Sequence, residues 1–136
     1  MRKFILAVLL LFVTANIANA RPRVFLEDDE GFTYISSYDY ILFSPGNRAG
    51  TCYDLGSIEI LEDSDDYFEF SIKRVTIQYN DASIIGEDES IFSENLNTDE
   101  IFLDDESIDN GRFFNPVSGK THREIYEKIK SVALED

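Results

Sequence analysis

The stretch "YFEFSIKRVTIQY", Tyr67–Tyr79, alternates large apolar residues with polar ones and predicts the strongest β-strand of the chain. Its first half places three apolar residues on one face of the strand: Phe68, Phe70 and Ile72. Its second half places three on the opposite face: Val75, Ile77 and Tyr79. Two explanations are open, a β-bulge near Lys73-Arg74 that restores the register or a bend from one packing surface to another, and we favour the bulge.

A second long strand is predicted upstream, in "FTYISSYDYILF", Phe32–Phe43. Its aromatic residues recur at period two and are expected to point the same way: Phe32, Tyr34, Tyr38 and Tyr40, with Leu42 continuing the row. Such a row is typical of the packed face of a sheet, but tyrosine is also enriched at the centres of protein interfaces. Tyr34, Tyr38 and Tyr40 are therefore candidate interaction residues.

Shorter strands are predicted at Gly56–Leu61, Ile91–Leu96 and Ile101–Ser107. The turns between the strands are expected at "SPGN", in the acidic segment Glu62–Asp66, at "NTDE" and at Asp109–Gly111, where Asn-Gly favours a tight turn.

The C-terminal segment changes to a helical period and predicts a helix over residues 121–133. One stripe of the helix is apolar: Ile125, Ile129, Val132 and Ala133. Thr121 and Glu124 have the spacing of a capping box. The solvated side is expected to carry Arg123, Glu127, Lys128 and Lys130, with Glu124 and Lys128 as an ion pair. The predicted fold is therefore α+β, a twisted antiparallel β-sheet of about five strands with one C-terminal α-helix packed on it.

The first twenty residues have the three parts of a secretory signal peptide. Arg2 and Lys3 precede the apolar run Phe4–Val13, and "ANA", residues 18–20, supplies the small residues of a cleavage site. We expect cleavage before Arg21, so that residues 1–20 are the signal peptide and residues 21–136 form a single small exported domain. The apolar run is too short for a membrane anchor, so no stable membrane insertion is expected after cleavage. Periplasm, cell surface and external medium all remain open as destinations.

The chain is strongly acidic, with 27 Asp and Glu residues against 12 Lys and Arg residues. Nucleic acid is not an expected partner, because its recognition depends on basic residues that neutralise phosphates. The charge favours a protein partner that is cationic or presented on a host surface. The sequence leaves the oligomeric state open.

No Lys or Arg occurs between Arg74 and Arg112, although eleven carboxylates do. Most such residues form solvated faces that protect sheet edges. A calcium site made of Asp104, Asp105 and Asp109 is a weaker alternative, because "DDESIDNG" lacks the ligand spacing of an EF-hand. Glu100, Asp104 and Asp105 are candidate contacts for a basic partner.

Few residues suggest catalysis. His122 is the only histidine and Cys52 the only cysteine, too few ligands for a zinc or iron site. A Cys52–His122 couple would depend on the fold, and Cys52 is expected to be a partly buried, inert thiol. A glycosidase would need a cleft with stacking aromatic residues, and the chain has no Trp. We expect a non-enzymatic protein with no catalytic residue and no cofactor.

Three stretches carry a family resemblance: "YISSYDYI", "FSIKRV" and the closing "NPVSGKTHREIYEKIKSV". With the signal peptide and the acidic hairpin, this order of parts resembles small exported bacterial domains similar to surface-adhesin protein E. Ser36 and Ser37 stand where that pattern often has Asp, and one Cys stands where the adhesin has a pair. The resemblance implies the fold, export and an interaction role at the cell surface, and it implies no catalytic residue.

Three hypotheses for function follow. The first is a non-enzymatic exported or cell-envelope protein that acts through protein contacts, as an adhesin-like binding module. The second is an acidic inhibitor or scavenger of a cationic enzyme such as a lysozyme. The third is a calcium-binding exported domain.

Overall fold

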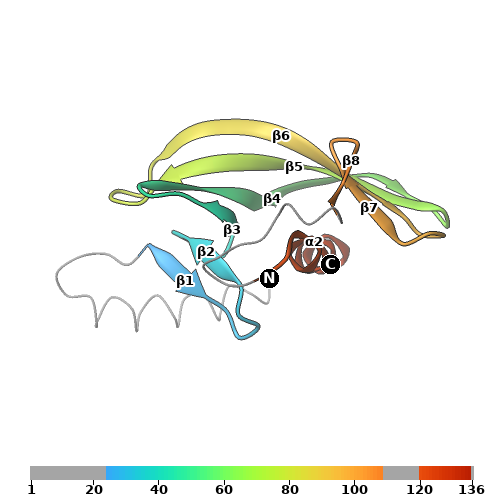
Figure 1. Cartoon of the computed structure of the whole chain (residues 1–136), viewed down its shortest axis with the longest axis horizontal. Helices are drawn as coiled ribbons and strands as arrows, with labels where there is room; N and C mark the ends of the chain where they lie inside the picture. Colours follow the sequence, from blue (N-terminus) through green and yellow to red (C-terminus); the bar gives the residue numbers. More distant parts are fainter. Residues whose placement is uncertain (1–23, 109–119, 136) are drawn as a thin grey trace.

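A computed structural model describes residues 24–108 and 120–135. These residues form one antiparallel sheet of eight strands, in which each strand lies beside its neighbours in sequence, and a helix near the C-terminus (Figure 1). The strands are β1 (Phe25–Glu27), β2 (Thr33–Ile35), β3 (Tyr40–Pro45), β4 (Ala49–Asp63), β5 (Tyr67–Gln78), β6 (Ile84–Asn95), β7 (Glu100–Leu103) and β8 (Glu106–Ser107), and the helix is α2 (His122–Leu134).

The α+β class and the antiparallel order are confirmed, but the sheet has eight strands rather than about five. Part of the difference comes from Phe32–Phe43, which is not one strand. Ser36 has a positive φ of 75° and turns the chain, so β2 and β3 form a hairpin in which Tyr34 lies opposite Ile41. Tyr34 and Tyr40 therefore point to opposite sides of the sheet, and the predicted single row of aromatic residues is wrong.

The predicted helix is confirmed. The Thr121 hydroxyl accepts from the backbone N of Glu124 at 3.1 Å, and the Glu124 carboxylate accepts from the backbone N of Thr121 at 2.8 Å. This reciprocal pair satisfies N–H groups that have no partner in the first helical turn. The sheet curls around α2, which lies below β4–β7 and beside β2 and β3 in Figure 1.

β5 buries opposite faces in its two halves. Its pairing with β6 runs without interruption from Tyr67 to Thr76, so the bulge expected near Lys73-Arg74 is absent and the alternative, a change of packing surface, is correct. The irregularities lie instead in β4. There the four residues Leu55–Ile58 lie opposite the single residue Ile72 of β5, and Leu61 is an extra residue with no partner in the β4–β5 register.

On the side that faces α2, called the helix side, the core is mostly aromatic. Phe70, Phe92 and Tyr126 of α2 are fully buried and in mutual ring contact at 5.3–5.9 Å between centroids. The same cluster includes Phe68 and Ile72 from the first half of β5.

On the opposite side of the sheet, called the outer side, a smaller core contains Ile35, Leu42, Cys52, Val75 and Ile77. Cys52 lies opposite Val75 in the β4–β5 register, and its neighbour Tyr53 points to the helix side, where it contacts His122. The second half of β5 therefore packs away from α2.

Among residues 24–108 and 120–135, no helix combines the length and the apolar character that crossing a membrane requires. The predicted signal peptide, the turn at Asp109–Gly111 and the candidate metal ligand Asp109 lie outside the described residues.

We predict that Gly50→Ala destabilises the outer core. A Cβ at Gly50 would lie 2.7 Å from Leu42 Cδ1 and 2.8 Å from Tyr79 Oη, which also binds the backbone of Gly46. We expect a loss of about 1–3 kcal/mol in the free energy of unfolding, measured with urea. Gly86→Ala is the matched control, because its nearest neighbour would be Thr76 Cβ at 3.6 Å. Equal losses in the two variants would contradict this explanation.

Candidate protein-binding surface

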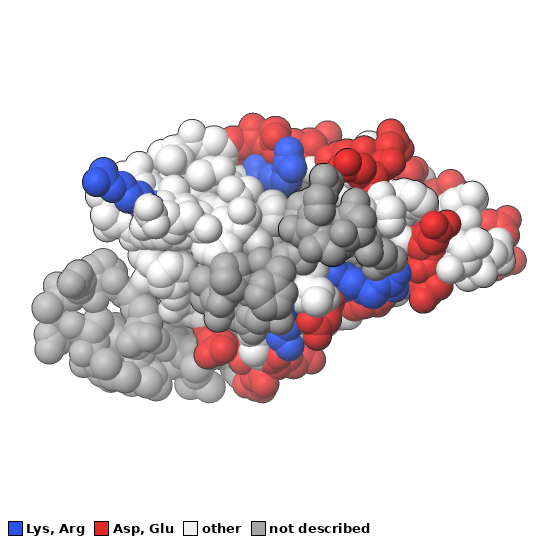
Figure 2. All heavy atoms as spheres, viewed as in Figure 1, with Lys and Arg blue, Asp and Glu red and all other residues white. Residues whose placement is uncertain are grey.

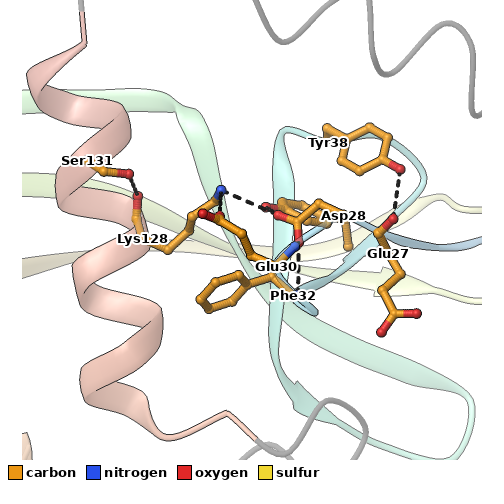
Figure 3. Close-up of polar contacts among 8 residues, drawn as sticks. Glu27, Asp28, Glu30, Phe32, Tyr38, Lys128 and Ser131 are labelled. Atoms are coloured by element: carbon orange, nitrogen blue, oxygen red, sulfur yellow. Dashed lines mark hydrogen bonds and ion pairs between the residues drawn. The ribbon is translucent and has the colours of Figure 1, made fainter.

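The helix directs its cations toward the sheet. Lys128 lies between Asp28 and Glu30 of the β1–β2 loop, with its Nζ 3.4 Å from Asp28 Oδ2 and 5.6 Å from the centre of the Phe32 ring (Figure 3). Its side chain is only 12% exposed. The expected solvated position and the pairing with Glu124 are therefore wrong, because the long apolar stem of Lys128 is buried while its ammonium reaches carboxylates from another element.

Asp28 is the centre of this contact. Its carboxylate accepts from Tyr34 Oη at 2.7 Å and from the backbone N of Phe32 and of Glu30, each at 3.0 Å. Burial acts to raise the pKa of Asp28, but these hydrogen bonds and the charge of Lys128 lower it overall. The carboxylate is therefore ionised at neutral pH and fixes the loop against α2.

We predict that Tyr34→Phe destabilises the protein in a pH-dependent way. Because the folded pKa of Asp28 lies below its unfolded value, its contribution is present above about pH 4 and is lost as the pH falls through the folded pKa. The variant should lose about 1.5–3 kcal/mol at pH 7, as expected for a hydrogen bond to a charged group, and less at pH 3. Urea unfolding at both pH values measures this.

Tyr38→Phe is the control for this experiment. Tyr38 Oη donates to the backbone carbonyl of Glu27 at 3.2 Å, so its loss should be smaller and the same at both pH values (Figure 3). A loss in Tyr34→Phe that does not change with pH would show that the Asp28 carboxylate is not involved.

Two further cations of α2 bind the predicted acidic segment. Lys130 Nζ lies 2.7 Å from Glu94 Oε1, and the same oxygen accepts from Tyr126 Oη at 2.8 Å. Arg123 donates to the backbone carbonyl of Asp99 at 2.8 Å. Lys130 is only 22% exposed, so it too departs from the predicted solvated side. The positive charge of the helix is thus largely used within the fold.

The outer side of the sheet keeps its negative charge. Cross-strand partners share a face, so the register places six carboxylates together on the outer side of β4–β6. We call this set the acidic face: Asp54, Glu59, Glu62, Glu69, Glu87 and Glu89. Lys73 lies among these carboxylates, with its Nζ 3.6 Å from Glu87 Oε2. It is the one described cation that the register places on the acidic face.

The carboxylates of the acidic face repel one another. Glu62 lies directly opposite Glu69, a like-charge pair that costs stability. The pKa of Asp54 is raised, first by burial and also by the negative charges of Asp39 and Glu87, although Gly56 N and Lys73 act against this. Figure 2 shows carboxylates along the upper margin and at the right-hand end of the molecule.

Apolar side chains are exposed among these charges. Ile91, opposite Ser71 on the outer side, is 40% exposed, and Tyr67 at the end of β5 is 42% exposed. Phe102 of β7, opposite Ser93, is half-buried on the same side. A partner docking here would cover apolar surface as well as charge.

The candidate interaction residues divide between the two sides of the sheet. Glu100 is exposed and shares the outer side with Asn95, and Tyr40 borders the acidic face opposite Asp54. Tyr34 is only 2% exposed in the helix-side core, and the Tyr38 ring contacts it in a tilted arrangement with 4.9 Å between the ring centroids. The acidic face was missed from the sequence, although the polar residues that alternate with Phe68, Phe70 and Ile72 were a signal for it.

Asp104 and Asp105 form the turn between β7 and β8. Both have positive φ, 50° and 72°, as the two central residues of a type I′ hairpin turn require. Asp104 also binds Ile91 of β6, accepting its backbone N at 2.9 Å through Oδ1. Within the described ranges no group of three or more His, Cys, Asp or Glu residues is arranged to hold a metal ion.

We predict that Asp105→Gly stabilises the protein by about 0.5–1 kcal/mol, because glycine adopts positive φ without the steric cost of a Cβ. Thermal unfolding measures the change. Asp65→Gly, in the β4–β5 turn, is the control: Asp65 is not among the positive-φ residues, so glycine there should give no gain. A gain in both variants would point to charge removal instead.

Cys52 and His122 do not form a couple. Cys52 is fully buried in the outer core, and His122 lies on the helix side, 2.8 Å from Tyr53 Oη. Burial raises the pKa of Cys52 above its ordinary value and lowers the pKa of His122 to about 4. At neutral pH the thiol is therefore protonated and the imidazole neutral.

Comparison with protein-family models, with curated proteins and with solved structures finds no match for this chain. The resemblance to domains similar to surface-adhesin protein E therefore stays a prediction from the sequence.

Proposed function

We propose that this chain is a non-catalytic, exported binding domain that recognises a basic protein through the acidic face. The observation that carries the proposal is the uneven distribution of ion pairs between the two sides of the sheet. Three cations of α2 bind carboxylates inside the fold, whereas six carboxylates of the outer side have Lys73 as their one described cation. A cationic partner would relieve the repulsion among them.

The exposed apolar residues support a protein partner over a small cation. Ile91 and Tyr67 gain nothing from a bound metal ion, but they would be covered at a protein interface. An adhesin-like role at the bacterial surface and the neutralisation of a cationic enzyme both use this type of surface. They differ in whether the partner is a matrix or envelope protein or an enzyme whose activity falls on binding.

The test is titration calorimetry of the full chain with a panel of basic proteins that includes a lysozyme. We expect binding that weakens strongly with added salt, because four of the six carboxylates are exposed: Glu59, Glu62, Glu87 and Glu89. The double variant Glu69→Lys/Glu89→Lys should weaken it roughly tenfold or more.

A matched control has the same change in net charge at another place. Asp29 in the β1–β2 turn and Glu127 on α2 are exposed, and Asp29→Lys/Glu127→Lys should weaken binding much less. Equal weakening in the two double variants would show attraction to net charge alone, and the absence of binding across the panel would contradict the proposal. Loss of lysozyme activity in the complex would favour the inhibitor.

A further inference from the structure

Half of β4 has a neighbouring strand on one side only. Its pairing with β3 ends at Asp54, and the backbone N of Leu55 donates to Asp39 O at 2.6 Å as the last contact with that side. Beyond this point Gly56–Ile58 form an irregularity opposite Ile72, and Glu59–Asp63 pair with β5. No strand of residues 24–108 pairs with the other edge of Gly56–Asp63. Figure 1 shows this half of β4 continuing to the right, past the end of β3.

The open edge is accessible. All five residues from Glu59 to Asp63 are exposed, and the side chains of Ile60 and Leu61 are 44% and 49% exposed. The edge of a strand that faces no neighbouring strand presents backbone N–H and C=O groups that can pair with another extended chain. The exposed apolar residues add contact area for the side chains of such a chain.

Charge decides which chain fits. Glu59, Glu62 and Asp63 have no cationic partner in the described part of the protein. A second copy of this edge would bring these carboxylates against their own equivalents, which opposes self-association. A segment containing Lys or Arg would bring opposite charges together instead.

A second open edge provides a comparison. Ile84–Ser90 of β6 pairs with β5, whereas β7 pairs only with Phe92–Asn95. Two of its three carboxylates are already engaged: Glu87 Oε2 lies 3.6 Å from Lys73 Nζ, and Asp88 binds Arg74 through two hydrogen bonds at 2.8 and 2.9 Å. The third, Glu89, lies opposite Lys73 in the register. The β6 edge therefore offers less uncompensated charge to a cationic strand.

We propose that the open edge of β4, Gly56–Asp63, binds an extended basic segment of a partner protein, which adds to the sheet as an antiparallel or parallel strand. This contact shares its cationic partner with the proposed function, but it uses the backbone of an edge and not the side chains of a face. The bulge at Leu61 limits the added strand to a short segment.

The test uses a synthetic peptide of alternating Val and Lys, added to the full chain, with amide hydrogen exchange as the readout. We expect exchange in Gly56–Asp63 to slow by about threefold or more at saturating peptide, with no change in Ile84–Ser90. The same peptide with alternate amides N-methylated keeps its charge but loses the donors of one edge. It should bind at least about tenfold more weakly.

Two variants of the chain locate the contact. Leu61→Lys places a cation on the β4 edge and should remove the protection, whereas Ile85→Lys, at the corresponding extra residue of β6, should leave it. Equal binding of the methylated peptide, or protection that does not fall on Gly56–Asp63, would overturn the proposal.

The experiments distinguish failure of this proposal from failure of the proposed function. If only the edge proposal is wrong, basic proteins still bind the acidic face but do not protect Gly56–Asp63 from exchange. If only the proposed function is wrong, the peptide still protects the edge in the variant Glu69→Lys/Glu89→Lys.

Discussion

The change of buried face within β5 is the constraint on which the rest of the structure depends. Phe68, Phe70 and Ile72 pack toward α2, whereas Val75 and Ile77 pack toward the outer side. Because a regular strand cannot place both sets on one side, the sheet needs a separate core at each end. On each side of the sheet, the part that lies outside the core carries polar residues. The acidic face is this part of the outer side.

The distribution of ion pairs follows from the same arrangement. α2 covers the helix side between the β1–β2 loop and the β6–β7 hairpin, so its cations meet carboxylates on both flanks: Lys128 meets Asp28, and Lys130 meets Glu94. The outer side has no helix opposite it in the described residues, so its carboxylates face solvent. In the described part of the chain, α2 thus determines which acidic residues form ion pairs within the fold and which face solvent.

The helix and the class of fold could be predicted because their signals are local. The Thr121–Glu124 capping box and the stripe of Ile125 and Ile129 lie within one element, and both are present in the structure. The position of Lys128 could not be predicted, since its partners Asp28 and Glu30 are about a hundred residues away in sequence. The turn at Ser36 was missed because the aromatic spacing continues across it, so one hairpin imitates one long strand. The acidic face required the register of three strands, which alternation within one strand does not supply.

The two ends of the sheet differ in one more respect. Between residues 40 and 53 the one charged side chain is Arg48, and between residues 75 and 86 it is Asp81, whereas the opposite hairpin tips carry Glu62, Asp63, Asp65 and Asp66. In the view of Figure 2, the described atoms at the upper left accordingly show no acidic residue. Among the described residues, negative charge is therefore displaced along the long axis, so this part of the chain has an electric dipole as well as a net charge. Near a cationic surface it experiences a torque that turns the acidic hairpin tips forward before any contact forms. The exposed apolar residues Ile84 and Ile85 at the other end are then turned away from that surface.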